Sequence, residues 1–168
     1  MSYIDHFQLA DDYITHIDPA INLITDPFIL SRYTGFLSVS AVTVYELAIK
    51  TIFIDFASRK HNVFGAFTFS HFDRINGQIM LGVLRKKHIG AFGEKYIQRF
   101  DRILEQKESD ILNSNGISIK YSYNNIIQWR HGFAHEGKVP STATYDEAKN
   151  SYYAGKYLIE CLYEAMKR

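Results

Sequence analysis

Cysteine is nearly absent from this chain of 168 residues, which contains only Cys161. A single thiol excludes a disulfide bond within the chain, and it cannot supply a metal site made of several thiolates. The first residues, Met1 to His6, lack the basic start and apolar core of a secretory signal peptide. We therefore expect a protein of the reducing cytoplasm.

Proline is also scarce, and neither positive nor negative charge is in clear excess. The chain has three prolines, and its 19 basic and 18 acidic residues leave a formal charge of +1. A contact with nucleic acid would need a local basic patch, because the chain as a whole is not cationic. With 46% hydrophobic and 22% charged residues, the composition is that of a folded globular protein. The length predicts one domain over residues 1–168.

Signatures of several enzyme classes are missing as well. The sequence has no glycine-rich phosphate loop, no dinucleotide-binding fingerprint and no local motif of a serine or cysteine nucleophile. It also has no internal repeat and no convincing parallel-strand pattern. Helical periodicity is the structural signal that remains.

Apolar residues recur at helical spacing through most of the chain, which predicts an all-α bundle of about five or six helices. The expected elements are an amphipathic helix over residues 2–17, a buried helix over residues 36–54, an ordered aromatic loop over residues 59–77, a helix over residues 73–87, a helix from Phe92 that fades over residues 107–110, and a last helix opened by a capping box at Thr144 and Glu147. Residues 117–123 alternate in polarity and are interpreted as a helix start by about Ser122 or, alternatively, as a strand.

Glu46 and Lys50 are the charged residues of the otherwise apolar helix expected over residues 36–54. Two charges near its middle argue against a membrane span. Because the two residues are four positions apart in the favourable order, they can form an ion pair on the helix surface. The alternative is that Glu46 points into a polar pocket shared with the histidines described below.

Arg85, Lys86 and Lys87, followed by His88, form a short basic stretch before Gly90. Such residues suit the C-terminal end of a helix, where the helix dipole favours cations. The same three cations are weaker candidates for binding RNA phosphates.

The densest group of reactive side chains lies in the segment Trp129-Arg130-His131-Gly132-Phe133-Ala134-His135-Glu136-Gly137. Gly137 and Pro140 are stop signals, so this cluster is expected in the last turns of a helix. Metal-free cleavage of RNA needs a base for the 2′-hydroxyl, a cation for the phosphate and an acid for the leaving oxygen. Histidine can serve as base or acid, and arginine binds phosphate through its planar fork.

Arg130 and His135 are five residues apart, so on a regular helix they stand about 140° apart and do not converge. A two-fold dimer that packs these helix ends together would bring two arginines and two histidines into one cleft. We expect a homodimer on this ground. Two other interpretations remain: His131 and His135 as zinc ligands, for which the helix offers no third ligand, and all three side chains as capping groups of a helix end.

The motif from Arg130 to His135 resembles the arginine-polar-x-x-x-histidine signature of the HEPN superfamily. Its setting is also similar: late in an all-α chain, before a short loop and a final helix. Residues 44–47 in a buried early helix and residues 145–149 at the start of the last helix fit the same order. The chain looks closest to the stand-alone bacterial branch that includes the RiboL-PSP-HEPN and MAE_28990-like groups.

This resemblance implies a metal-independent endoribonuclease without a cofactor, which acts as a dimer, leaves a 2′,3′-cyclic phosphate and serves in antiphage defence or toxin systems. Arg130 and His135 would be catalytic, His131 would fill the polar position, and Glu46 would be a supporting residue. HEPN toxins that pair with a nucleotidyltransferase antitoxin carry a tyrosine two residues after the histidine, where this chain has Gly137. The alternative is a catalytically silent HEPN module that binds RNA, nucleotide or a protein partner.

Overall fold

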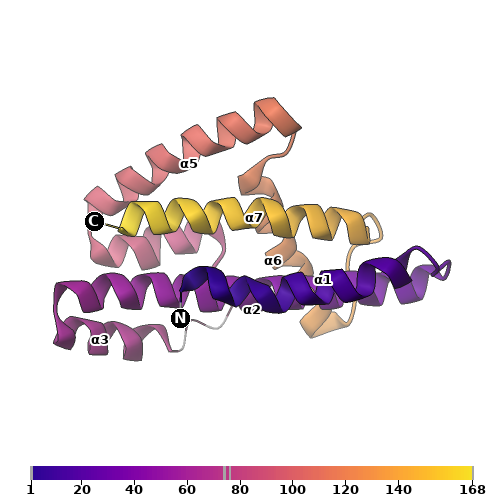
Figure 1. Ribbon diagram of the computed structural model, residues 1–168, viewed down its shortest axis with the longest axis horizontal. Coiled ribbons are helices and arrows are strands. Elements are labelled where there is room, and N and C mark those ends of the chain that lie inside the picture. Colours follow the sequence, from indigo (N-terminus) through magenta and orange to yellow (C-terminus); the bar gives the residue numbers. More distant parts are fainter. Residues whose placement is uncertain (1, 74, 76, 168) are drawn as a thin grey trace.

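A computed structural model of the protein describes residues 2–73, 75 and 77–167 (Figure 1). Within these residues every regular element is helical, which confirms the all-α prediction, and seven α-helices are present where five or six were expected. In chain order the elements are the 3₁₀ helix η1 (Tyr3–Phe7), α1 (Gln8–Ile21), α2 (Pro27–Lys60), α3 (Asn62–Phe72), α4 (Leu81–Val83), the π-helix η2 (Leu84–Ile89), the 3₁₀ helix η3 (Gly90–Phe92), α5 (Glu94–Asn115), α6 (Ile119–Glu136) and α7 (Tyr145–Met166).

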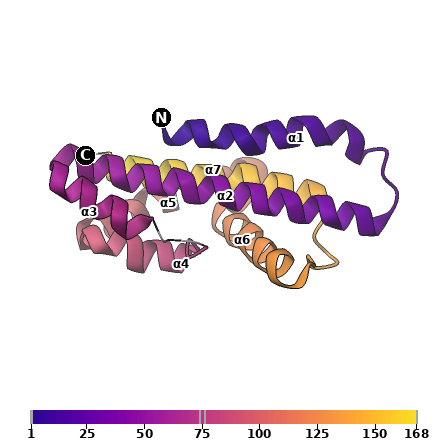
Figure 2. The same cartoon turned by 90° about the horizontal axis from the view of Figure 1, so that it is seen from below.

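α2 is the axis of the bundle and, with 34 residues, is far longer than the predicted segment 36–54. It begins early because Asp26 caps it: the Asp26 carboxylate accepts a hydrogen bond of 2.8 Å from the Phe28 N–H, and Pro27 occupies the first helical position. Helix α1 runs along one side of α2, while α3 and α6 lie on the opposite side (Figure 2). In Figure 1, α7 lies between α2 and α5.

α2 also has the length and apolar composition of a membrane span. More than half of that apolar stretch is buried inside the protein, against α1, α3, α6 and α7. It is therefore the core helix of the bundle, and no membrane span is indicated.

The prediction of an ordered loop over residues 59–77 is wrong for most of that range. α2 continues to Lys60, and the next residues form α3, which His61 caps by accepting a hydrogen bond from the Val63 N–H. Helix α3 sits close to α2 because Gly65 has no side chain: a Cβ there would lie 2.3 Å from the Ser58 hydroxyl oxygen. The aromatic residues that suggested a loop are divided between a buried Phe72 and an exposed face.

The helix predicted over residues 73–87 is also wrong as a continuous element. Arg74 and Asn76 within it lie outside the described residues. The described residues 77–80 are not helical, and helical structure resumes as α4 and the π-helix η2. Leu84, His88 and Ile89 are all buried in η2. In a regular helix Leu84 and Ile89 would stand about 140° apart, and the wider π-helical turn brings them closer to one face.

The second half of the chain follows the sequence more closely. α5 runs on to Asn115 and ends at Gly116, which takes the left-handed conformation of a helix C-cap (φ 68°). Ser118 caps α6, so the strand interpretation of residues 117–123 is wrong and the helix starts at Ile119. The capping box at Thr144 is confirmed, and the apolar stripe of α7 is buried, as predicted.

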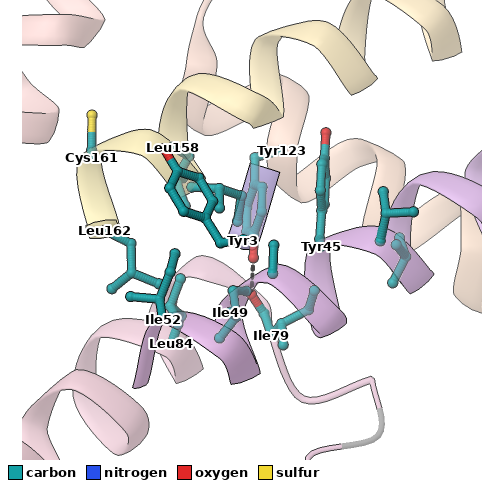
Figure 3. Packing of buried hydrophobic residues seen from close by; sticks show 14 of the residues in the cluster. Tyr3, Tyr45, Ile49, Ile52, Ile79, Leu84, Tyr123, Leu158, Cys161 and Leu162 are labelled. Carbon is teal, nitrogen blue, oxygen red and sulfur yellow. Dashed lines mark hydrogen bonds between the residues drawn. The ribbon is translucent and has the colours of Figure 1, made fainter. Parts of the chain in front are cut away.

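The centre of the core is a column of three stacked tyrosines. Tyr45 on α2 stacks on Tyr123 of α6 and Tyr152 of α7, with ring centroids 5.5 Å and 5.9 Å apart. Their hydroxyls are all used: Tyr45 donates to the Tyr152 carbonyl (2.5 Å), Tyr123 to the Ile79 carbonyl (2.7 Å) and Tyr152 to Asp11 (2.9 Å). Figure 3 shows Tyr45 and Tyr123 among aliphatic side chains, with the bond to Ile79 drawn. Burial raises the pKa of each of these phenols.

The tyrosine column yields a stability prediction at Gly155. A Cβ at this position would lie 2.1 Å from the Tyr45 hydroxyl oxygen, so Gly155→Ala must displace that ring and strain its hydrogen bond to Tyr152. We expect the free energy of unfolding to fall by about 1–3 kcal/mol, measured by urea denaturation. Gly82→Ala is the control, because a Cβ at Gly82 meets no atom within 4 Å. Equal midpoints for the two variants would contradict the prediction.

His88 makes stability depend on pH. It is 2% exposed, its Nε2 lies 2.8 Å from the Gln78 carbonyl oxygen, and burial lowers its pKa below the ordinary value. The unfolded chain therefore takes up a proton at a pH where the folded chain does not, so stability is full above about pH 6.5 and decreases as the pH falls below it. His88→Gln, which cannot titrate, should reduce the difference between urea midpoints measured at about pH 7.5 and about pH 5. The exposed His16→Gln should leave that difference unchanged, and an unaltered difference in His88→Gln would refute the assignment.

Candidate active site

The reactive cluster lies in the last two turns of α6, as predicted. Helix α6 ends at Glu136, and Gly137 caps it in the left-handed conformation (φ 65°), with its N–H donating to the Phe133 carbonyl (3.0 Å). A residue with a side chain would be strained at that position. The carbonyl of Lys138 then folds back over Gly132, where a Cβ would lie 3.1 Å from it. The end of the helix and the following loop are thus held together.

Three side chains fix the end of α6 on α2. Phe133 fills the space left by Gly35, where a Cβ would lie 2.1 Å from the ring, and packs edge-on against Phe36 with centroids 5.3 Å apart. Arg32 donates a hydrogen bond of 2.5 Å to the Gly137 carbonyl and stacks over the Phe28 ring at 4.6 Å. A cation at this carbonyl compensates the negative end of the helix dipole. One face of the helix end is therefore anchored where α6 crosses α2 (Figure 2).

Arg32 and Gly35 were missed by the sequence analysis. Their signal is weak, because a lone arginine in an apolar helix resembles a surface residue. A glycine at mid-helix, which costs about 1 kcal/mol relative to alanine, is the better clue to a close helix crossing.

Arg130 lies on the side of α6 that faces α2 and the stretch before α4. It lines a small pocket of about 190 Å³ with Val42, Gly77 and His131 among its neighbours. Gly77 has φ 78°, and a Cβ there would lie 3.3 Å from Arg130 Nη1 and 3.9 Å from Glu46 Oε1. The guanidinium and the Glu46 carboxylate therefore flank the same point of the backbone.

Glu46 does not pair with Lys50 in the described part of the chain. Its Oε1 accepts a hydrogen bond of 2.6 Å from the Gly77 N–H, while Lys50 Nζ donates to the Asp73 carbonyl (3.1 Å). Both side chains thus hold the segment that follows α3 against α2. Glu46 positions the backbone beside Arg130 and contributes negative charge there.

His131 and His135 form an exposed pair one turn apart on α6. Their ring centroids are 4.4 Å apart, with the planes inclined by 53°. Both rings are accessible to solvent, whereas Arg130 is half-buried. No group of three His, Cys, Asp or Glu side chains among the described residues lies close enough to hold a metal ion.

The basic stretch Arg85-Lys86-Lys87 does not form one free patch. Arg85 makes a two-fold hydrogen bond to Asp101 (2.7 and 2.5 Å), Lys87 donates to the Gln78 side chain (2.7 Å), and Lys86 is exposed. The next residue, His88, is buried. RNA binding by these three cations stays a prediction.

The site therefore contains the half-buried guanidinium of Arg130 beside the carboxylate of Glu46. The accessible imidazoles of His131 and His135 lie further around α6. Guanidinium groups bind phosphate oxygens, and imidazoles transfer protons near neutral pH. A model of the RiboL-PSP-HEPN family matches residues 5–168. The chain belongs to the RiboL-PSP-HEPN family. This membership agrees with the HEPN resemblance of the Arg130–His135 motif and supports a nuclease or RNA-related module. Searches of curated proteins and of solved structures gave no match.

Glu46→Ala tests the support beneath Arg130. Removing the carboxylate leaves the Gly77 N–H without its acceptor, so this amide should exchange with deuterium about tenfold faster in hydrogen-exchange NMR. Glu46→Gln keeps an acceptor oxygen and should preserve most of the protection. Equal exchange rates in the two variants would show that Glu46 does not hold this segment.

Proposed function

We propose that this HEPN protein is a metal-independent endoribonuclease whose active site is shared between two copies of the chain. The observation that carries the proposal is that the chain belongs to a HEPN family, and its segment from Arg130 to His135 resembles the HEPN signature. Arg130 turns toward Glu46 and Gly77, while His135 points to solvent on another side of α6. A second copy would supply the imidazole opposite each guanidinium.

The chemistry follows from those two side chains. One His135 takes the proton of the 2′-hydroxyl, whose oxygen attacks the neighbouring phosphorus. The bond from phosphorus to the 5′-oxygen breaks, and His135 of the second copy returns a proton to that oxygen. Arg130 binds the phosphate oxygens as their negative charge increases. The products are a 2′,3′-cyclic phosphate and a free 5′-hydroxyl, so the reaction consumes no water and no cofactor.

The surface around the cluster supports association between copies. Phe28, Phe36 and Leu47 on α2 are 64%, 50% and 39% exposed, and Phe36 touches Phe133 at the end of α6. Where such side chains form a contiguous apolar patch beside a site, they are typical of a protein interface. We propose that this face of α2 and α6 forms the homodimer, and that the protein acts on RNA in the cytoplasm as a toxin or defence nuclease.

Arg130→Ala and His135→Ala test the mechanism. Each variant should lose RNA cleavage by about a hundredfold or more, because proton transfer and charge stabilisation each contribute at least that factor. Cleavage of a mixed RNA pool is measured with EDTA present, and end-group analysis should find the cyclic phosphate. His16→Ala and Arg102→Ala, two exposed residues away from the cluster, are the matched controls and should cut normally.

Three outcomes would refute the proposal. Full activity in both variants would remove these residues from the mechanism, and a strict monomer in a solution mass measurement could not form the shared site. Binding of RNA without turnover, weakened by the same substitutions, would instead identify a catalytically silent module.

A further inference from the structure

A second concave surface lies on α6, on the side turned away from Arg130. This α6–α7 groove of about 450 Å³ is lined by Tyr121, Asn125 and Trp129 of α6, Asn150 of α7 and Thr142 of the loop between them. No lysine or arginine lines it among the described residues, and its one charged side chain, Glu147, belongs to the capping box of α7. Among the described residues the groove therefore offers no side-chain cation to a phosphate, and most of its polar groups are amides and hydroxyls.

Aromatic and amide groups alternate along this groove. Tyr121, Asn125 and Trp129 follow one another at steps of four residues, so they form a single stripe on α6. Tyr121 is 68% exposed, and Trp129 rests partly on the core while lining the groove. Two ring systems thus flank an amide on one stripe of the helix; aromatic faces can stack a planar base, and an amide can bind its edge.

The two asparagine amides that line the groove are available for a ligand. Neither the Asn125 nor the Asn150 side chain has a hydrogen-bond partner within the described ranges, whereas neighbouring Asn124 accepts one from the Leu81 N–H (3.1 Å). An amide presents a donor and an acceptor side by side. That pair matches the edge of a nucleobase, and of adenine in particular, whose amino group donates to the amide oxygen while its ring nitrogen accepts from the amide NH2.

Tyr121, at the edge of the groove, also belongs to an exposed face of α6 that leads toward His135. Tyr121, Gln128 and His135 are exposed and recur every seven residues, so they share one face of α6. Trp129 directly precedes Arg130 in the chain. From Asn125 to His135 the helix rises about 15 Å, the length of about four nucleotides of stacked strand.

We propose that the α6–α7 groove binds one unpaired nucleobase, with adenine preferred, of the RNA strand that is cut at Arg130 and His135. The base stacks against Trp129 and Tyr121, and Asn125 and Asn150 bind its edge. The groove thereby selects single-stranded RNA and sets the base found a few nucleotides from the cleaved bond. This inference rests on the proposed nuclease function for its substrate, but its binding test is independent of cleavage.

Trp129 is the only tryptophan of the chain, so its fluorescence reports directly on the groove. The protein is titrated with a tetranucleotide of adenosines whose 2′-hydroxyls are methylated, which prevents cleavage. We expect saturable quenching of the tryptophan emission. Asn125→Ala should weaken the binding about tenfold and reduce the preference for adenine over uracil. Asn113→Ala, an exposed asparagine on α5, is the matched control and should bind normally.

Several results would overturn the inference. These are the absence of quenching, equal quenching by an abasic tetranucleotide, and equal affinity of the Asn125→Ala and Asn113→Ala variants. Binding of free adenosine monophosphate as tight as that of the tetranucleotide would identify a small-molecule pocket and refute the role in RNA.

The same experiments separate this inference from the proposed function. Cleavage of RNA without quenching would leave the nuclease intact and remove the base site. Specific quenching without cleavage in parallel assays would retain the base site and remove the nuclease. Tyr121→Leu removes one stacking ring at an exposed position and keeps Trp129 as the fluorescent reporter. This variant should bind the tetranucleotide several-fold more weakly.

Discussion

The stacking of Tyr45, Tyr123 and Tyr152 is the constraint on which the rest of the bundle depends. Each ring belongs to a different helix, and each hydroxyl must find an acceptor, because an unpaired buried hydroxyl costs about 1–3 kcal/mol. Those acceptors lie on α7, at Ile79 and on α1. The three hydrogen bonds therefore fix the positions of α1, α2, α6, α7 and the segment around Ile79 relative to one another. The bond from Tyr123 to Ile79 also fixes the end of the segment that contains Gly77. The column therefore connects the centre of the core with the surface beside Arg130.

The sequence predicted the helical class and the second half of the fold well, because the local signals there are strong. The capping box at Thr144, the apolar stripe of α7 and the stop at Gly137 are all properties of neighbouring residues, which periodicity and capping rules detect. The errors lie at α3 and over residues 73–92, where tertiary packing determines the secondary structure. Helix α3 has no Asp, Glu, Lys or Arg, so its two faces look alike in the sequence, and the buried side is known only from tertiary contacts such as those of Gly65 with Ser58 and of Phe72 with Phe53. The π-helical turn depends in the same way on what His88 and Leu84 meet in the core.

The same difference between local signals and long-range contacts applies to the candidate site. The motif residues Arg130, His131 and His135 were identifiable from their spacing, and their position at a helix end could be predicted. The residues that hold the motif in place could not be predicted, because Arg32, Gly35 and Gly77 lie far away in the chain and contact it only in the folded structure. Glu46 was ambiguous between an ion pair with Lys50 and a pocket near the histidines. In the structure Glu46 accepts from the Gly77 N–H and Lys50 donates to the Asp73 carbonyl, so the two side chains hold the same segment instead of pairing with each other.

The burial of Cys161 has a practical consequence. It is 2% exposed, and burial raises the pKa of its thiol to about 12, so the reactive thiolate is scarce at neutral pH. To thiol reagents the folded protein therefore behaves almost as if it had no cysteine. A cysteine introduced on the exposed face of α6 would react alone, without removal of the native one. Spin labels or fluorophores attached there would measure the separation of the two copies in an assembly.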